Sequence, residues 1–341
     1  MPSSLQWTFS PVTAFATLAS DWDGVNRNAR NLPILDAAFF ARLMAHFAPK
    51  HGAIIAVLRE GAEVRCAGIF EPGRGRTWQT YQPAQAPLGA WVNATGFAIA
   101  PALSRWFGTP GGRLSLGAGI SQIDPELLPR PPASGGLATL DYIETAFMNV
   151  SGSFDVYWAG RGKNLRQNVR KQLSRFERDG VSAGLLEIAD AGAAGAAVDE
   201  YGRMESGGWK GAEGSALHPD NEQGKFYRSL FEDYATRGEA VVYQYRYGDR
   251  AVASDLCLAR NGVLIVLKTT YDEAQRNTSP AMLMHHDLLK PIFNERRYRR
   301  IEFYGRIMEW HGRLTEDKKI LYHLNYFRFP WMTKLVGARR G

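Results

Sequence analysis

Residues 263–289, VLIVLKTTYDEAQRNTSPAMLMHHDLL, carry the clearest structural pattern in the chain. The apolar residues 263–270 are typical of a strand, and a polar loop containing a proline separates them from a helix predicted at 281–293. A further short strand is predicted at 300–304. This order of strand, loop, helix and strand exposes backbone N–H groups at the start of the helix, where they suit a bound anion.

The sequence upstream of this stretch extends the same α/β pattern. In the second half of the chain a helix and two strands are predicted before it, at residues 225–236, 240–245 and 251–258. The first half contains a helix and three strands in the same order, predicted at residues 37–47, 53–58, 63–70 and 76–81. This repeat predicts an internal duplication of one α/β unit.

The two copies differ after their third strand. In the first copy residues 108–136 are rich in Gly and Pro, so the helix and strand that complete the second copy are expected to be eroded there. Part of this segment is interpreted as the connection between domains, and a helix is predicted next, at 137–147. We therefore expect a mixed α/β fold of two domains, residues 1–150 and 151–341, with the chemistry in the second.

The overall composition is that of a folded protein. Its 341 residues suit two domains, and 45% hydrophobic with 22% charged residues is the balance of a packed chain rather than a disordered one. No segment has the apolar run of a signal peptide or a membrane span, which predicts a cytoplasmic location. Cys66 and Cys257 lie far apart in apolar segments, so buried free thiols are expected rather than a disulfide or a zinc site.

The positive charge is concentrated in the second half. The chain has 41 basic and 34 acidic residues, a net charge of +7, and much of the excess lies in residues 161–178 and 296–313. This distribution favours a focused cationic site over a uniformly basic surface. Arg166 and Arg170 lie one turn apart on the polar face of a predicted amphipathic helix, where they either grip phosphate or an anionic glycan or simply face water.

Several charged residues stand in apolar strands. Asp255 and Glu302 each interrupt one, and a charge in that position either faces solvent or is held for a purpose. Strand alternation places Glu302 and Tyr304 on the same face. Lys268 ends an apolar strand, where it either contacts a ligand or carboxylate or is merely solvated.

A glycine-rich stretch after an alanine-rich helix contains Glu205, Trp209 and Lys210. A tryptophan in such a loop is expected either to contact a substrate or to anchor the loop.

His285 and His286 are adjacent in a predicted helix, so their side chains point in different directions, and no third ligand stands at a metal-like spacing. No metal site is therefore expected.

Five segments together resemble the CelD/BcsL family of acetyltransferases, which is part of the GNAT superfamily and similar to the FemAB-like enzymes with tandem GNAT folds. They are residues 162–170, 205–210, 268–283, 301–305 and 308–311. The resemblance runs in order from about residue 78 to residue 329. It implies two tandem GNAT-like acyltransferase domains, the first degenerate and the second catalytic.

The resemblance also implies an activity and a cofactor. The protein is expected to transfer acetyl from acetyl-coenzyme A to an amine or hydroxyl of a sugar-related or other small polar acceptor, in exopolysaccharide or cellulose biosynthesis. The residues expected to bind the coenzyme are Arg276, Ser279, Ala281 and Met282, although the family pattern prefers Gly where Ala281 stands. The residues expected to bind substrate are Arg166, Arg170, Trp209, Lys210 and Lys268.

Acyl transfer from a thioester needs a base for the acceptor proton, a donor for the oxyanion and an acid for the departing thiolate. The candidate bases are Glu205, Asp255, Asp272 and Glu302. Tyr304 and Tyr271 are the candidate acids, with Glu302 and Tyr304 preferred as a pair on one strand face.

Two alternatives stay open. One is a FemAB-like transferase that uses aminoacyl-tRNA, which the basic helix would suit through phosphate contacts; the absence of a long helical hairpin of alternating charge argues against it. The other is a non-catalytic scaffold subunit of a polysaccharide-synthesis assembly, which the departure at Ala281 favours slightly. The expected partners are accordingly a small-molecule or glycan acceptor, the polysaccharide-synthesis machinery, or tRNA.

Overall fold

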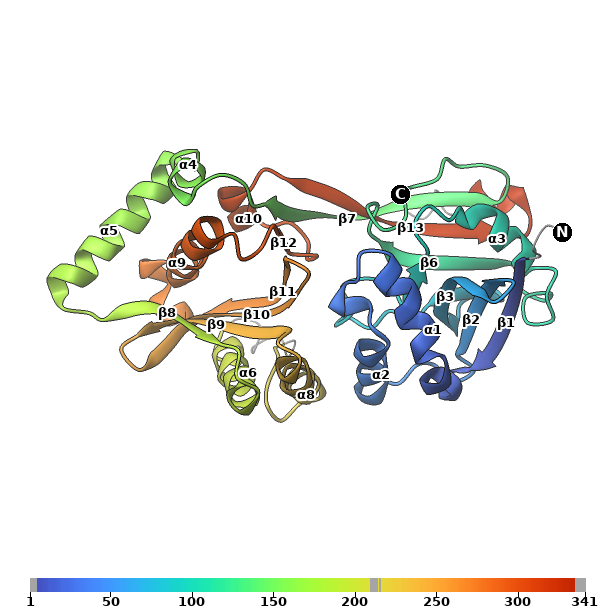
Figure 1. Ribbon diagram of the computed structural model, residues 1–341, viewed down its shortest axis with the longest axis horizontal. Coiled ribbons are helices and arrows are strands. Elements are labelled where there is room, and N and C mark those ends of the chain that lie inside the picture. Colours follow the sequence, from blue (N-terminus) through green and yellow to red (C-terminus); the bar gives the residue numbers. More distant parts are fainter. Residues whose placement is uncertain (1–4, 209–213, 215, 335–341) are drawn as a thin grey trace. The chain divides into compact units, whose positions relative to one another are not determined.

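The computed structural model describes residues 5–208, 214 and 216–334. The chain divides into two compact units: residues 1–144 together with 319–341, and residues 145–318. It passes from the first unit to the second within strand β7 (Leu137–Asn149) and returns at the start of strand β13 (Lys318–Phe327). The elements are labelled in Figure 1.

The first unit is a mixed sheet with strand order β1-β2-β3-β4-β6-β13. Only β4 and β6 are parallel among these neighbours, with Thr77 opposite Gly117. The elements are β1 (Leu5–Pro11), α1 (Phe15–Asn28), α2 (Ala37–His46), β2 (Ile54–Glu60), β3 (Glu63–Pro72), β4 (Thr77–Thr80), β5 (Trp91–Asn93), α3 (Ile99–Trp106) and β6 (Gly117–Ile123).

The second unit repeats this plan with strand order β8-β9-β10-β11-β12-β7, in which only β11 and β12 are parallel. Helices α6 and α8 lie on one face of the sheet and α9 on the other (Figure 1). The elements are α4 (Phe154–Ala159), α5 (Lys163–Asp179), β8 (Ala183–Ile188), α6 (Ala191–Ser206), α8 (Glu222–Thr236), β9 (Ala240–Tyr247), β10 (Arg250–Arg260), β11 (Val263–Tyr271), α9 (Pro280–Glu295), β12 (Arg300–Glu302) and α10 (Glu309–Leu314).

The two units therefore share one topology. Each has a strand, two helices, three antiparallel strands, a crossover helix and a parallel strand, in that order. An antiparallel strand then completes each sheet: β13 in the first unit and the end of β7 in the second. The expected mixed α/β fold is confirmed, and the common topology is what an internal duplication produces.

Two local predictions were wrong. Residues 137–147 form strand β7 instead of a helix, because pairing with β12, where Met148 lies opposite Ile301, outweighs the helix-like spacing of apolar residues. The first copy also keeps its crossover helix and parallel strand, as α3 and β6, so it is not eroded there. The glycines of residues 108–136 lie partly within β6 and not only in a connection.

Each unit has its own aromatic or aliphatic core. In the first, Trp7, Phe70 and Trp106 pack together, and the Trp7 Nε1–H donates to the Ala102 carbonyl at 2.8 Å. In the second, the apolar side of α9 packs over β9 and β10 through residues such as Leu283 and Leu288. Large buried side chains of this kind each contribute roughly 1.5–3 kcal/mol.

Cys66 and Cys257 are free and buried, as expected. Among the helices that the structure describes, none has both the length and the apolar character needed to cross a bilayer.

Candidate functional site

The second unit opens where its parallel strands part. Strand β12 pairs with β11 only through the three pairs from Val263–Arg300 to Ile265–Glu302, whereas β11 continues to Tyr271. The register with β10 also shifts at this point: Cys257 faces Val266 but Leu256 faces Lys268, which leaves Leu267 as the extra residue of a β-bulge. A bulge bends its strand, so β11 turns away from its former partner.

A cavity of about 780 Å³ fills this parting and lies wholly within the second unit. This volume is in the range of small-molecule and cofactor sites. The lining residues are Glu205, Gly208, 266–271, Glu273, Arg276, 279–282, His285, Phe303, Gly305, Arg306, 308–311 and Arg313.

The start of helix α9 forms one wall of the cavity. Ser279 precedes the helix in the left-handed region, with φ of 54°, and Pro280 occupies the first helical position. The amides of Met282 and Leu283 bond the Ser279 carbonyl, whereas the Ala281 amide has no acceptor in the described parts of the chain. A free amide at a helix start, together with the helix dipole, favours an anion.

Helix α5 holds the loop that leads into α9. The Asn168 side-chain amide donates to Ser279 Oγ at 3.2 Å, and the Gln172 side-chain amide donates to the Asn277 carbonyl at 3.3 Å. Asp272 caps the turn at the other end by accepting from the Ala274 amide, and it also forms an ion pair with Arg250. Asp272 is thus occupied in loop structure and lies outside the cavity lining.

Five of the predicted coenzyme and substrate residues converge on the cavity. Arg276, Ser279, Ala281 and Met282 all line it. Lys268 lines it too, and its ammonium lies 5.6 Å from the centre of the Tyr227 ring, in a cation–π contact.

Glu205 is a buried carboxylate in the cavity wall. It is 2% exposed; Oε1 accepts from the Tyr201 hydroxyl at 3.1 Å and Oε2 accepts from the Leu217 amide at 2.8 Å. Burial, with the nearby charges of Glu205 and Asp255, raises the pKa of Tyr201 well above its usual value. Tyr201 therefore stays protonated and continues to donate to Glu205.

Neither Glu302 nor Tyr304 lines the cavity. Strand β12 ends at Glu302, and Tyr304 follows in the left-handed region with φ of 47°, so the alternation of strand faces does not reach it. Glu302 is fully buried and accepts from Arg300 Nε at 2.7 Å. Phe303, between the two, is the residue that lines the cavity.

Asp255 and His285 form a buried pair that the sequence alone did not reveal. Asp255 lies on β10 and is fully buried; its Oδ2 lies 3.0 Å from His285 Nε2 of α9. His285 lines the cavity, and its ring stacks on that of Trp310, with centroids 5.2 Å apart. The signal was present as an acidic residue in an apolar strand and a histidine in an apolar helix, but nothing in the sequence indicates that they meet.

Arg166 and Arg170 line a second, smaller hollow of about 310 Å³ with Trp158. Both side chains are exposed, and Arg166 Nε donates to the Arg161 carbonyl at 3.0 Å. Trp209 and Lys210 fall outside the described residues.

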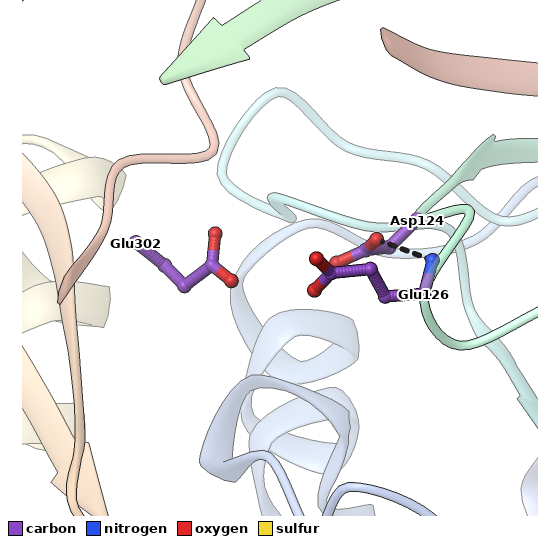
Figure 2. Close-up of side chains that lie close together, drawn as sticks. All are labelled: Asp124, Glu126 and Glu302. Carbon is purple, nitrogen blue, oxygen red and sulfur yellow. Dashed lines mark hydrogen bonds between the residues drawn. The ribbon is translucent and has the colours of Figure 1, made fainter. Parts of the chain in front are cut away.

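The first unit contains a buried charged cluster. Asp124 is fully buried, and the Lys319 ammonium lies 2.8 Å from its Oδ2, with Arg30 at 3.5 Å from the same oxygen. Its Oδ1 accepts from the Glu126 amide at 2.9 Å (Figure 2). Burial alone would raise the pKa of Asp124, but Lys319, the Glu126 amide and Arg30 together outweigh burial and hold this pKa below its usual value.

Residues 163–319 match the model of the acetyltransferase (GNAT) domain. That segment includes α5, the loop before α9 and the whole lining of the cavity. No curated protein matches the sequence significantly.

Two solved structures share the fold across both units. FemX superposes with a TM-score of 0.59 at 9% identity, covering 96% of this chain and 99% of FemX. The C-terminal domain (DUF2156) of a protein named as a lysylphosphatidylglycerol synthetase from Agrobacterium fabrum gives a TM-score of 0.55 at 13% identity, covering 95% of this chain and 96% of that domain. At such identities the similarity establishes the fold.

Proposed function

We propose, from the premise that residues 163–319 are a GNAT-type acetyltransferase domain, that the second unit transfers acetyl from acetyl-coenzyme A to an amine or hydroxyl of a sugar-related or other small polar acceptor. The observation that carries this proposal is the open cavity at the parting of β11 and β12, with the free Ala281 amide at its wall. The role in exopolysaccharide synthesis rests on the sequence resemblance to the CelD/BcsL family.

The donor site lies along the loop and first turn of α9. The pyrophosphate of coenzyme A would meet the Ala281 amide and the side chains of Ser279 and Arg276, which line the same wall. Helix α5 fixes the position of this loop through Asn168 and Gln172, so the anion meets a preformed site.

Reaction takes place beside the bulge of β11. The thioester carbonyl needs a hydrogen-bond donor for its developing negative charge. The extra residue of a β-bulge has an amide that is not hydrogen-bonded to the neighbouring strand. Leu267 occupies this position and lines the cavity. Glu205, whose oxygens already hold two donors, faces the same space and is suited to orient the acceptor.

Arg166 and Arg170 would bind an anionic group of donor or acceptor in the second hollow, with the Trp158 ring as an apolar side. Two exposed guanidinium groups one turn apart match the oxygens of a phosphate or carboxylate. Changing both to Gln should raise the apparent KM for one substrate without changing the melting temperature.

Binding of the donor tests the proposal directly. Acetyl-coenzyme A and coenzyme A should raise the melting temperature, because each binds the folded state. Ala281→Asp should weaken coenzyme binding at least about tenfold, since it sets a negative charge against the pyrophosphate. Ala193→Asp, in the first turn of α6 and outside the cavity lining, is the matched control and should leave affinity unchanged. Equal affinity in both variants would overturn the donor site.

A second candidate is transfer from aminoacyl-tRNA, as in the FemAB-like alternative. Two observations favour it: the fold shared with FemX, and the exposed cations along α5, which are Lys163, Arg166, Arg170, Lys171, Arg175 and Arg178. Under this alternative bulk tRNA, and not acetyl-coenzyme A, raises the melting temperature, and tRNA affinity falls steeply with salt. A protein that responds to neither ligand would fit the scaffold alternative.

A further inference from the structure

The pairing of His285 with Asp255 determines which ring nitrogen of this cavity-lining histidine carries the proton. A carboxylate only accepts hydrogen bonds, so at His285 Nε2, 3.0 Å from Asp255 Oδ2, the ring carries its proton. In the neutral imidazole the other nitrogen, Nδ1, then holds a lone pair and no proton.

Neither His285 Nδ1 nor Asp255 Oδ1 has a hydrogen-bond partner among the described residues, and both atoms are buried. His285 is 4% exposed and Asp255 is 0% exposed. A buried polar atom left without a partner costs about 1–3 kcal/mol, so stability alone does not account for this arrangement. Because His285 lines the cavity, a molecule bound there is placed to supply the partner that Nδ1 lacks.

The neighbours of His285 hold its ring in place and do not compete for its role. Trp310 stacks on one face of the ring at 5.2 Å between centroids. His311 stacks on Trp310 at 3.7 Å, but its own Nδ1 accepts the Met308 amide at 2.9 Å. Burial lowers the pKa of His311 to about 4, so it is neutral near pH 7 and its Nδ1 is already engaged.

The titratable groups that face this pair come from several elements. Asp255 lies on β10 and His311 on α10, and the charges of His285 and Asp255 both act on His311. Tyr201 of α6 and Cys257 of β10 respond to the charge on Asp255, which adds to burial in raising the pKa of each. Tyr201 and Cys257 therefore stay protonated near pH 7.

We propose that His285 is the general base of the transfer and that Asp255 is its positioning residue. This inference deepens the proposed function and rests on it. The acceptor nitrogen or oxygen forms a bond to the thioester carbonyl carbon while its proton passes to His285 Nδ1. Asp255 stabilises the resulting imidazolium through Nε2. The C–S bond then breaks, and the coenzyme thiolate leaves with the proton returned by the imidazolium.

Substitution of His285 is the first test. His285→Gln keeps a donor for Asp255 but removes the titrating lone pair, so kcat should fall about 10²- to 10⁴-fold with unchanged coenzyme affinity. His323→Gln is the matched control: this half-buried histidine of the first unit accepts the Gln122 amide at 3.2 Å and should retain full turnover. A kcat for His285→Gln equal to that of the control would overturn the proposal.

Asp255→Asn and the double variant separate positioning from structure. Asp255→Asn keeps the shape and should lower kcat about 10- to 100-fold, because the imidazolium loses its counter-charge. If the two residues act as one unit, the double variant should lose no more activity than His285→Gln alone, since groups that act together are not additive. The double variant could instead lose kcat by the product of the two single losses while it binds the coenzyme as tightly as the wild type. That result would contradict the proposal that the two residues act as one unit.

The pH profile distinguishes catalysis from packing. In the wild type, kcat/KM should rise with pH along an acidic limb of slope one, and this limb should disappear in His285→Gln. An unchanged limb would overturn the role of His285 while leaving the proposed function intact. Absence of turnover in the wild type with acetyl-coenzyme A, across amine and sugar acceptors, would overturn the proposed function and this step together.

Discussion

The two units differ at the place where the third antiparallel strand leaves the parallel strand. This place is open in the second unit and closed in the first. In the second unit β11 passes the end of β12 with a bulge at Leu267, and a cavity of about 780 Å³ lies beyond. In the first unit, residues 81–90 are inserted at the corresponding place, between β4 and β5, which both pair with β3. Only about 30 Å³ of cavity remains beside this insertion.

The insertion closes the first unit through bonds to β6 and its end. Gln82 Nε2 donates to Gln122 Oε1 at 2.9 Å, and the Gly89 amide donates to the Gln122 carbonyl. The helix that follows also differs: α3 starts after Ala98 and buries Leu103 and Trp106, with no polar loop of the kind that Ser279 ends. The first unit therefore keeps the same topology although residues 81–90 fill the place where the second unit has its cavity.

Filling the cavity of the second unit should make it as closed as the first unit, and it has the largest expected effect on activity. Thr269→Trp places a large ring in the cavity that Thr269 lines. Acetyl transfer should fall by about 10³-fold or more, because substrate can no longer occupy the near-attack position. Leu186→Trp, at an exposed site on edge strand β8, is the control. Turnover by Thr269→Trp within threefold of the control would place the chemistry elsewhere.

Removing the cation of the closed unit should affect stability and not donor binding. Lys319→Met removes the ammonium that lies 2.8 Å from the buried Asp124 Oδ2 and keeps the Arg30 guanidinium, 3.5 Å from the same oxygen. The free energy of unfolding should fall by about 3 kcal/mol, as measured by urea titration. Affinity for coenzyme A should not change, and a parallel loss of affinity would contradict a donor site confined to the second unit.

The close fit of the insertion can be loosened with a single methyl group. A Cβ on Gly89 would collide with the Ser121 carbonyl oxygen, so Gly89→Ala should cost about 2–3 kcal/mol. Gly184→Ala, where a Cβ meets no atom within 4 Å, is the matched control and should change stability by less than about 0.5 kcal/mol. Equal stability of the two variants would show that the insertion is not tightly held.

Acid should destabilise the two units in different pH windows. The folded pKa of His311 is about 4, below the usual value near 6.5, so the unfolded chain takes up the proton first as pH falls. This contribution is complete above about pH 6.5 and is lost toward pH 4, with about 2 kcal/mol gone by pH 5. The lowered pKa of Asp124 makes its contribution disappear only below about pH 4. Urea titrations of His311→Gln should lack the loss between pH 6.5 and 5; a loss equal to that of the wild type would assign it to another group.

The strands and helices with strong local patterns were predictable from sequence. The predicted strands at 240–245, 251–258 and 263–270 correspond to β9, β10 and β11. Local apolar pattern and turn residues determine these elements, whereas β7 was mistaken for a helix because its partner strands are distant in sequence. The division at residue 150 stays a prediction about domains; the compact units place residues 319–341 with the first.

The candidate site was predictable only where one segment supplies it. Ser279, Ala281 and Met282 line the cavity because the loop and helix start are contiguous. The pair of Asp255 and His285 depends on the packing of α9 over β10, and the closing of the first cleft depends on a contact between residues 81–90 and β6. Neither contact produces a periodic pattern in the sequence from which it could be predicted.

Hydrogen–deuterium exchange with and without saturating acetyl-coenzyme A tests the comparison most directly. The account predicts slower amide exchange in residues 266–283, which contain the end of β11 and the start of α9, and unchanged exchange in residues 77–98, the matching part of the first unit. Protection of residues 77–98 with none in 266–283, or protection in neither segment, would contradict it.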